Sequence, residues 1–545
     1  MNDASPNMTD YEATHESFKL EVPEYFNYTR DVIDAWAERS PDKVALLAVG
    51  PDGTDERRIN FGELSERSKR AAAFLSSLGV AKGDRIFVML QRVPEWYDVL
   101  LGCFRIGAIP MPGTPLLTER DIEFRITVAD AVAAITDVEG AIKVDAVRDS
   151  CAALEHSVVV GGDAAGWTRF DDPGVAGDGE ADVETRADDP LLIYFTSGTV
   201  AYPKMVLHTQ ASYGIGHEIT ARFWQDLKAD DLHWTFSDTG WAKAAWGKLF
   251  GQWSVGASNF LWDVRGKPDF ELMLGLIEKV GVTTFCAPPT VYRALVLMDL
   301  GGRDWSQLRH CVSAGEPLNP EVIKVWKEAT GLTIYDGFGQ TETVNVLANY
   351  RCMPIKPGSM GKPTPGFDVC VVDDEGGVLD SGSEGHVAIR VKPTRPVGLF
   401  QEYWRDPSAT SGAFRGDWYY TGDRAFVDED GYFWFVGRSD DVIISAGYRI
   451  GPFEVESALV EHEAVAEAAV VGKPDAARGQ IVKAFVVLAP GFEASDDLAS
   501  AVQDHVKSVT APYKYPREID FVEDLPKTVS GKIRRVELRE RAAAE

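Results

Sequence analysis

Hydrophobic positions in the N-terminal part of the chain follow two alternating patterns. Predominantly apolar runs at residues 44–49, 85–90 and 284–287 are typical of buried strands. Segments at 61–78 and 95–106 instead repeat apolar residues at helical spacing, with polar residues between them. Strands that alternate with helices predict α/β layers built on a largely parallel sheet.

The pattern changes toward the C-terminus. From about residue 358 to 436, short β-like runs alternate with Gly/Asp turns, which indicates a β-rich subdomain. After Asp440 a compact pattern of helices and strands begins. The predicted organisation is a loose N-terminal arm over residues 1–20, a large domain over 21–439 and a small α+β domain over 440–545.

Length and charge narrow the class of protein. A chain of 545 residues is too long for one hydrophobic core, so at least two domains are expected. Lysine and arginine number 55 and aspartate and glutamate 84, so the net charge is 55 − 84 = −29. This charge argues against nucleic acid or an anionic membrane as the main partner.

Two further features predict a cytoplasmic protein. The six cysteines are scattered without a CxxC pair, which fits reduced thiols better than disulfides or a zinc site. No secretory signal is visible at the N-terminus, and no apolar run reaches the ~18 residues that a membrane span needs. We therefore expect a cytoplasmic location without stable membrane insertion.

A segment rich in hydroxyls follows the apolar run at 191–195. Thr196, Ser197, Gly198 and Thr199 are followed closely by Lys204. Backbone N–H groups and hydroxyls in such a loop can donate to phosphate oxygens, and the lysine adds positive charge. The segment lacks the Gly-Lys-Ser/Thr of a Walker loop. A polyphosphate loop and an ordinary loop between two strands both fit it.

Two polar segments follow later strands. Residues 315–317 offer backbone amides and a turn suited to a flat heterocycle, or form a simple loop. Residues 336–342 place an aromatic ring, two glycines, a hydroxyl and a carboxylate at a strand end, where α/β sheets bind ligands. Glu342 could hold Mg²⁺ beside phosphates, or it could satisfy a helix N-terminus.

Two charged residues occur in turns nearer the C-terminus. Asp423, in a Thr-Gly-Asp turn, suits two ribose hydroxyls, with a plain β-turn as the alternative. Lys532 follows a glycine in an exposed turn, where a solvated charge is the alternative.

In this order, the segments resemble the motifs of the adenylate-forming superfamily: acyl-CoA synthetases, adenylation domains of peptide synthetases, and luciferases. The similar segments are residues 196–204, 335–342, 420–423, 437–449 and 526–532. Residues 237–241 and 445–449 look most like the medium-chain acyl-CoA synthetases. The resemblance covers residues from about 30 to 540. It implies that the small domain rotates about a hinge at Asp440.

The resemblance implies ATP and Mg²⁺ as cofactors. The implied nucleotide-binding residues are Thr196, Ser197, Gly198, Thr199, Lys204, Gly315, Glu316, Pro317, Asp336, Gly337, Phe338, Thr341, Asp423 and Arg438. The loop of 196–204 would hold the β- and γ-phosphates, Phe338 would lie against adenine, and Thr341 would contact the α-phosphate. Glu342 would hold the magnesium ion, and Asp423 with Arg438 would bind the ribose.

The resemblance also implies residues for two chemical steps. Lys532 would reach the carboxylate and the α-phosphate during adenylation, so the implied catalytic residues are Lys532, Thr341, Glu342 and Arg449. After rotation about Asp440, the residues Gly447, Tyr448 and Arg449 would bind CoA for thioester formation.

The implied acyl pocket is lined by Trp241 and Gly339. Acetate-specific members of the superfamily carry tryptophan at the position of Gly339, so its missing side chain predicts a cavity that extends past this point. Each buried methylene contributes about 0.8 kcal/mol. We therefore expect medium-chain, branched or aryl acids as substrates.

One departure concerns Val200 and Ala201, which stand where the superfamily usually has a hydroxyl and a glycine. Ala201 restricts the backbone and Val200 cannot donate, so slower adenylation is expected. The sequence predicts an ATP-dependent, AMP-forming acyl-CoA synthetase whose partners are a small carboxylic acid, ATP and CoA. The alternatives are a ligase that loads a carrier protein and an impaired protein that binds ATP and an acid without turnover. A homodimer is compatible with the sequence.

Overall fold

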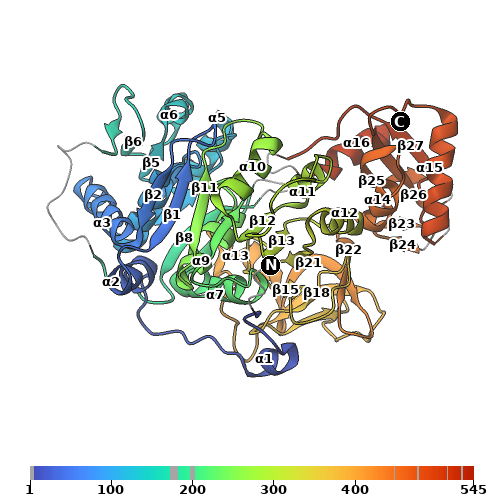
Figure 1. Cartoon of the computed structure of the whole chain (residues 1–545), viewed down its shortest axis with the longest axis horizontal. Coiled ribbons are helices and arrows are strands. Elements are labelled where there is room, and N and C mark those ends of the chain that lie inside the picture. Colours follow the sequence, from blue (N-terminus) through green and yellow to red (C-terminus); the bar gives the residue numbers. More distant parts are fainter. Residues whose placement is uncertain are drawn as a thin grey trace.

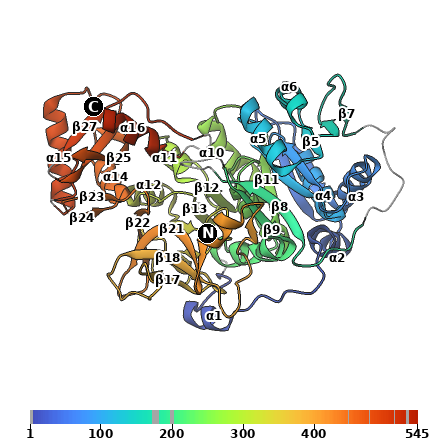
Figure 2. The ribbon, with the colours of Figure 1, turned by 180° about the vertical axis from the view of Figure 1, so that it is seen from behind.

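A computed structural model describes residues 5–171, 182–196, 203–446, 448–475, 478–511, 513–528 and 532–544, and all of these except Arg449 with their side chains. Figure 1 shows a large body of mixed helices and sheets, with the segment from β23 to α16 at one end. The two α/β sheets and the β-rich part lie in the larger body, as Figure 2 also shows from behind.

The largest sheet has the strand order β16-β15-β14-β13-β12-β10-β11-β1-β2. Its strands are β1 (Val44–Val49), β2 (Arg57–Asn60), β10 (Leu232–Thr235), β11 (Ser258–Trp262), β12 (Thr284–Ala287), β13 (His310–Ala314), β14 (Ile334–Phe338), β15 (Leu347–Ala348) and β16 (Lys362–Pro363). The strands from β14 to β1 in that order pair in parallel, and β2, β15 and β16 pair antiparallel at the edges. The loops after β10, β12, β13 and β14 therefore leave from one edge.

A second, parallel sheet has the order β4-β3-β5-β6-β7. Its strands are β3 (Arg85–Met89), β4 (Ile109–Pro112), β5 (Ala133–Thr136), β6 (His156–Val159) and β7 (Thr168–Arg169). Beside it, β8 (Pro190–Phe195), β9 (Met205–Thr209) and β19 (Glu402–Tyr403) form an antiparallel sheet. The pairing of β19 with β9 joins two segments that lie far apart in the sequence.

Helices fill the space between the sheets and cover their outer faces. The helices of this part are α1 (Tyr11–Ser17), η1 (Thr29–Asp34), α2 (Ala35–Arg39), α3 (Phe61–Ser77), α4 (Pro94–Ile106), α5 (Glu119–Ala129), α6 (Val138–Asp145), η2 (Arg148–Ser150), η3 (Gln210–Ile215), α7 (His217–Ile219), η4 (Thr220–Trp224), α8 (Ala242–Lys248), α9 (Phe250–Ser254), α10 (Phe270–Val280), α11 (Pro289–Leu295) and α12 (Pro320–Thr330). One core joins the largest sheet to α10, α11 and α12. A larger core joins both sheets to α3, α4, α8 and α9.

The β-rich part and the C-terminal part each have their own sheet. The first contains β17 (Val369–Val372), β18 (Gly385–Arg390), β20 (Phe414–Arg415), β21 (Trp418–Val427) and β22 (Phe433–Arg438), with α13 (Pro407–Ala413) nearby. The second contains β23 (Ile443–Ser445), β24 (Tyr448–Ile450), β25 (Val465–Asp475), β26 (Gly479–Leu488) and β27 (Glu518–Phe521), with α14 (Pro452–Val460), α15 (Asp496–Val509) and α16 (Arg535–Ala544). A separate hydrophobic cluster packs α14 and α15 on this second sheet.

The predicted loose arm over residues 1–20 is wrong for the residues that the structure describes. Residues 11–17 form helix α1, and Asp10 accepts a hydrogen bond from the backbone of Ala13 as its N-cap. Met8 is buried, and the hydroxyl of Tyr11 donates to the carbonyl of Pro363 at 2.8 Å. The polar composition of the arm hid these few apolar anchors.

A buried ionic cluster joins the amino ends of β10 and β13. The Arg309 guanidinium donates through Nε to Asp231 at 2.8 Å and through Nη1 to Asp226 at 3.1 Å. Arg351 also donates to Asp226, at 2.7 Å. Both carboxylates are buried, so each depends on its guanidinium partners to offset the loss of water.

We expect Arg309→Ala to lower the free energy of unfolding by about 3–5 kcal/mol, because buried Asp231 loses its guanidinium partner and buried Asp226 keeps only Arg351 of its two. Denaturant titration followed by tryptophan fluorescence measures the change. Lys324→Ala is the control. It breaks an exposed pair with Glu321 at 3.1 Å, worth at most about 1 kcal/mol. Equal effects of the two substitutions would contradict the role assigned to the cluster.

Candidate functional site

The loops after β13 and β14 lie side by side at one edge of the largest sheet. Ser313 pairs with Asp336 and Ala314 with Gly337 across the two strands. Gly315 then adopts φ of 114°, a left-handed conformation that favours glycine. The structure therefore brings the predicted adenine segments, 315–317 and 336–338, next to each other.

Asp336 is the most strongly perturbed acid in this group. The residue is buried, and its burial raises the pKa of the carboxyl to about 8. One carboxyl oxygen accepts from the backbone N–H of Gly337 at 3.1 Å. Near pH 7 the group is largely protonated, so it can donate a hydrogen bond toward a heterocycle.

The ends of the predicted phosphate loop meet. The backbone N–H of Thr196 donates to the Lys204 carbonyl at 3.0 Å, and the Lys204 N–H donates to the Thr196 hydroxyl at 3.2 Å. The exposed Lys204 ammonium lies 4.5 Å from the ring centre of Tyr403. Ser197, Gly198, Thr199 and the Val200-Ala201 departure lie outside the described residues.

The Thr341 carbonyl is held by two side chains from the strand and helix that follow the phosphate loop. The Tyr213 hydroxyl donates to this oxygen at 2.6 Å, and Nε2 of His208 lies 2.8 Å from it. Burial lowers the pKa of His208 to about 3, so this imidazole is neutral and donates from Nε2. Thr341 therefore has a fixed position relative to strand β9.

The carboxylate next to Thr341 is suited to a metal ion that arrives with phosphates. Glu342 is half-buried, and its Oε1 accepts from the Tyr403 hydroxyl at 2.8 Å. In the described residues, no group of three or more His, Cys, Asp or Glu side chains could hold a metal ion. A single carboxylate fits Mg²⁺, which takes one or two carboxylates together with substrate phosphates.

Asp423 lies opposite Arg438 in the pairing of β21 with β22. Gln340 donates from Nε2 to Asp423 at 2.7 Å and to the Thr421 carbonyl at 2.8 Å. Burial raises the pKa of the Asp423 carboxyl to about 6, and the Arg438 charge opposes this shift. Gln340 thus connects the predicted ribose site to the residues after β14.

The small C-terminal domain brings Lys532 toward these groups. Lys532 interacts electrostatically with Glu316, Asp423 and Glu342, although part of it remains exposed. Tyr448 is exposed and stacks on Tyr513, with ring centres 4.3 Å apart. Gly447 and the side chain of Arg449 lie outside the described residues. In this arrangement Lys532 faces the predicted nucleotide site.

The predicted hinge lies in the short connection between β22 and β23. The Arg438 Nε lies 3.6 Å from the Asp440 carboxylate, and Nη1 of Arg539 donates to the Asp440 carbonyl at 3.3 Å. Arg539 belongs to α16, so the C-terminal helix contacts the chain where the two domains join.

The expectation of an open cavity beyond Gly339 is wrong. A Cβ atom on Gly339 would lie 2.2 Å from Cη2 of Trp246 and 2.5 Å from the Val344 carbonyl oxygen. The Trp246 indole from α8 thus fills the space that the missing side chain leaves. Trp241 is the N-cap residue of the same helix, so α8 supplies both tryptophans.

Four residues at the site were not predicted from the sequence: Tyr403, Gln340, Tyr213 and Lys243. Lys243 follows Trp241 by two residues, and its ammonium donates to the Ala314 carbonyl at 2.7 Å. Gln340 lies within the predicted segment of 336–342 and directly precedes Thr341, so its position in the sequence could have identified it as a site residue. Tyr403 gave no such signal, because long-range backbone contacts bring it to Glu342: the pairing of β19 with β9 and the hydrogen bond from Phe400 to Glu342.

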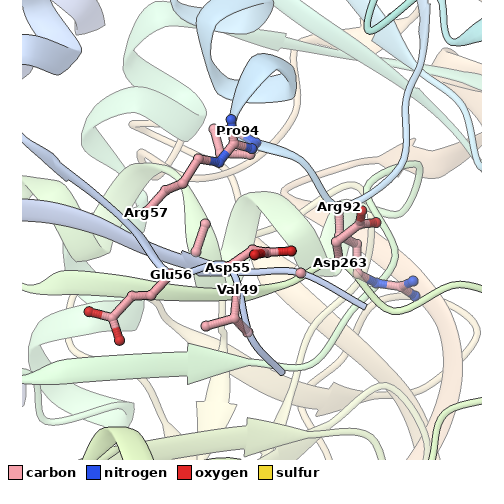
Figure 3. A pocket seen from close by; sticks show the side chains of 9 residues that line it. Val49, Asp55, Glu56, Arg57, Arg92, Pro94 and Asp263 are labelled. Atoms are coloured by element: carbon pink, nitrogen blue, oxygen red, sulfur yellow. The ribbon is translucent and has the colours of Figure 1, made fainter. Parts of the chain in front are cut away.

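A separate cavity of about 460 Å³ lies beyond the carboxyl end of β1 (Figure 3). Its side chains include Arg57, Arg92 and Asp263. The Arg92 guanidinium donates to the Ser237 carbonyl at 3.2 Å and to the Val264 carbonyl at 2.9 Å. Arg92 therefore supports the segment of 237–241 that leads into α8.

Comparison with known proteins agrees with this geometry. Residues 33–404 match the AMP-binding enzyme family, and residues 454–532 match the AMP-binding enzyme C-terminal domain. The chain is 47% identical over 548 residues to the mitochondrial acyl-coenzyme A synthetase ACSM3 of Mus musculus, covering 98% of this chain and 94% of the relative. It is 46% identical over 543 residues to the mitochondrial acyl-coenzyme A synthetase ACSM4 of Homo sapiens, covering 98% and 93%.

Solved structures show the same architecture. An anthranilate CoA ligase, AuaEII, in complex with anthranoyl-AMP superposes with a TM-score of 0.88 at 32% identity, covering 96% of this chain and 98% of that chain. A benzoate CoA ligase from Burkholderia xenovorans LB400 superposes with a TM-score of 0.82 at 28% identity, covering 94% and 100%.

The fold and these matches define a two-part enzyme that activates acids through an adenylate. The chain belongs to the AMP-binding enzyme family. The predicted superfamily, the fold class and the enzyme class, an AMP-forming acid–thiol ligase, are confirmed.

The predicted cytoplasmic location is wrong, because these acyl-coenzyme A synthetase relatives are mitochondrial proteins. Scattered reduced thiols fit the cytosol and other reducing compartments equally well. None of the helices in the described residues has the length and hydropathy needed to cross a membrane.

We expect kcat/KM for ATP to fall below about pH 6, because Asp423, whose pKa is raised to about 6, loses its charge there. The fall should approach tenfold per pH unit at lower pH. Initial rates between pH 5 and 8 test this, with circular dichroism to check that the fold persists. Asp423→Asn should have a lower kcat/KM for ATP at neutral pH, and its pH profile should lack this inflection. An identical inflection in the variant would assign it to another group.

Proposed function

We propose that the protein joins a carboxylic acid to CoA in two steps, with ATP as the activating co-substrate. In the first step a carboxylate oxygen attacks the α-phosphorus of ATP, and pyrophosphate leaves. In the second step the CoA thiolate attacks the acyl carbon, and AMP leaves. The observation that carries the proposal is the convergence of Lys204, Glu342, Asp423 and Lys532 from distant segments.

Adenylation requires two anions to meet, so the contribution of this chain is mainly charge and position. Lys532 from the small domain and Lys204 from the phosphate loop would oppose the charge of the phosphates. Mg²⁺ bound at Glu342 would neutralise further phosphate charge. Asp423 and Arg438 would hold the ribose, which fixes the α-phosphorus relative to the acid. No Ser/His/Asp triad is required.

Thioester formation would follow a rotation of the small domain about Asp440. The exposed position of Tyr448 supports this proposal, because a residue meant for CoA faces solvent while Lys532 faces the nucleotide site. Rotation would exchange the two, so that Gly447, Tyr448 and Arg449 replace Lys532. One small domain would then serve both half-reactions.

The acid would lie next to α8, between Trp241 and Trp246. Trp246 lies against Gly339, and its ring centre lies 6.3 Å from that of Trp224 in an edge-to-face arrangement. An aromatic wall suits aryl or medium-chain acids. The two similar solved structures include ligases of anthranilate and benzoate, which makes aryl acids a natural first test.

AMP release that depends on the acid, measured with and without CoA, tests the proposed function. A CoA ligase releases AMP steadily only with CoA, and mass spectrometry finds the acyl-CoA. A ligase for a carrier protein would form the acyl-adenylate but would not respond to CoA. An impaired binding protein would form neither product. Screening should span straight-chain acids from acetate to palmitate, and benzoate.

We expect Lys532→Ala to reduce acyl-adenylate formation by about a thousandfold, because a charged group at the reacting phosphate is lost. The rate of thioester formation from a preformed acyl-adenylate should remain within about threefold of the wild-type rate. Quenched-flow assays of each half-reaction measure the two rates. Equal losses in both half-reactions would contradict an exchange of Lys532 for residues 447–449.

We expect Trp246→Ala to move the substrate optimum toward longer or bulkier acids, because removal of the indole opens the space beyond Gly339. Each added methylene that becomes buried should raise kcat/KM about fourfold. The profile of kcat/KM against chain length measures this shift. Gly339→Trp should instead reduce the folded fraction, since even a Cβ meets Trp246. If Trp246→Ala instead lowered kcat/KM by the same factor for all acids, the indole would not limit the length of the pocket.

A further inference from the structure

Tyr403 lies between two charged residues that come from separate parts of the site. Its hydroxyl donates to Oε1 of Glu342 at 2.8 Å. Its ring centre lies 4.5 Å from Nζ of Lys204. One side chain therefore contacts both the predicted metal carboxylate and the lysine at the end of the phosphate loop.

The backbone around Tyr403 fixes this position. In strand β19, Tyr403 pairs with Val206 of β9, two residues after Lys204. The backbone N–H of Phe400 donates to the Glu342 carbonyl at 2.8 Å, and the Trp404 N–H donates to the Met205 carbonyl at 2.7 Å. Residues 400–404 thus join strand β9, which directly follows Lys204, to Glu342 through hydrogen bonds at both ends.

The Tyr403 side chain is enclosed by protein, and the residue is only 6% exposed. A phenol keeps its proton at neutral pH, so its hydroxyl donates and the Glu342 carboxylate oxygen accepts.

The hydroxyl contacts one carboxylate oxygen and leaves the other available. Oε1 of Glu342 is occupied by Tyr403, so Oε2 is the oxygen that can face a cation. Within the described part of the chain, no other side chain hydrogen-bonds to this carboxylate. Without the hydroxyl, the half-buried glutamate could rotate between several rotamers, and binding would have to order it.

We propose that Tyr403 is a positioning residue that orients Glu342 toward Mg²⁺ through its hydroxyl and Lys204 toward the phosphates through its ring. This inference rests on the proposed function, in which Mg·ATP binds at this end of the site. Tyr403 acts through the two charged side chains that it contacts, and the hydroxyl and the ring act on different partners.

Two substitutions separate these contributions. Tyr403→Phe removes the hydroxyl and keeps the ring beside Lys204. Tyr403→Leu removes both. Tyr350→Phe is the matched control, because Tyr350 is also buried and its hydroxyl donates to Thr364 at 2.8 Å. Tyr350 belongs to none of the predicted nucleotide segments.

The primary measurement is the melting temperature of the full-length protein with ATP plus Mg²⁺ and with ATP plus EDTA. In wild type and Tyr350→Phe, Mg²⁺ should add a clear increment to the stabilisation by ATP. Tyr403→Phe should keep the stabilisation by ATP in EDTA and lose most of the Mg²⁺ increment. Its apparent Kd for Mg·ATP should rise about tenfold, as expected for one lost hydrogen bond to a charged group. Tyr403→Leu should weaken both stabilisations.

Acyl-adenylate formation at varied Mg·ATP concentration is the second measurement. Tyr403→Phe should raise KM for Mg·ATP about tenfold and change saturated kcat by less than about threefold. A purely structural role would lower the melting temperature without ligands and leave the Mg²⁺ increment unchanged. That result, or tighter Mg·ATP binding in Tyr403→Phe, would overturn the inference. Absence of any ATP effect in wild type would instead refute the proposed function.

Discussion

The parallel pairing of β13 with β14 is the constraint on which the rest of the site depends. Parallel strands end at the same edge, so the loops after them have to meet there. Residues 315–317 and 336–342 are separated along the chain, yet the pairing of Ala314 with Gly337 fixes their separation to one strand spacing. Each other predicted contact of the nucleotide is placed relative to this pair.

The second requirement is to connect the remaining charged groups to that edge. Gln340 joins Asp423 of the β-rich part to the residues after β14. His208 and Tyr213 hold the Thr341 carbonyl, and residues 400–404 join the end of the phosphate loop to Glu342. Neutral side chains and backbone groups make most of these connections. Glu342 and Lys204 therefore keep their charges available for ligands.

The acyl end of the site shows how close packing changes a chemical expectation. A glycine in a binding motif suggests free space, but a neighbouring side chain can occupy that space at the density of a protein interior. Trp246 does so at Gly339. In the proposed acyl pocket, the width would then depend on α8 rather than on the glycine. Specificity for the acid would therefore be controlled by a different element from the loops proposed to bind the nucleotide.

The amino-acid sequence by itself determined the local structure, because local structure follows from neighbouring residues. Its apolar periods located strand β1 (Val44–Val49) and helix α3 (Phe61–Ser77). They also located the compact pattern of helices and strands that begins after Asp440. Its motifs named Lys204, Glu342, Asp423 and Lys532 as a group. Only the tertiary structure decided which side chains contact them and what fills the space beside Gly339. Those contacts join residues far apart in the chain, such as Tyr403 and Lys204, and long-range packing leaves no periodic signal in a single sequence.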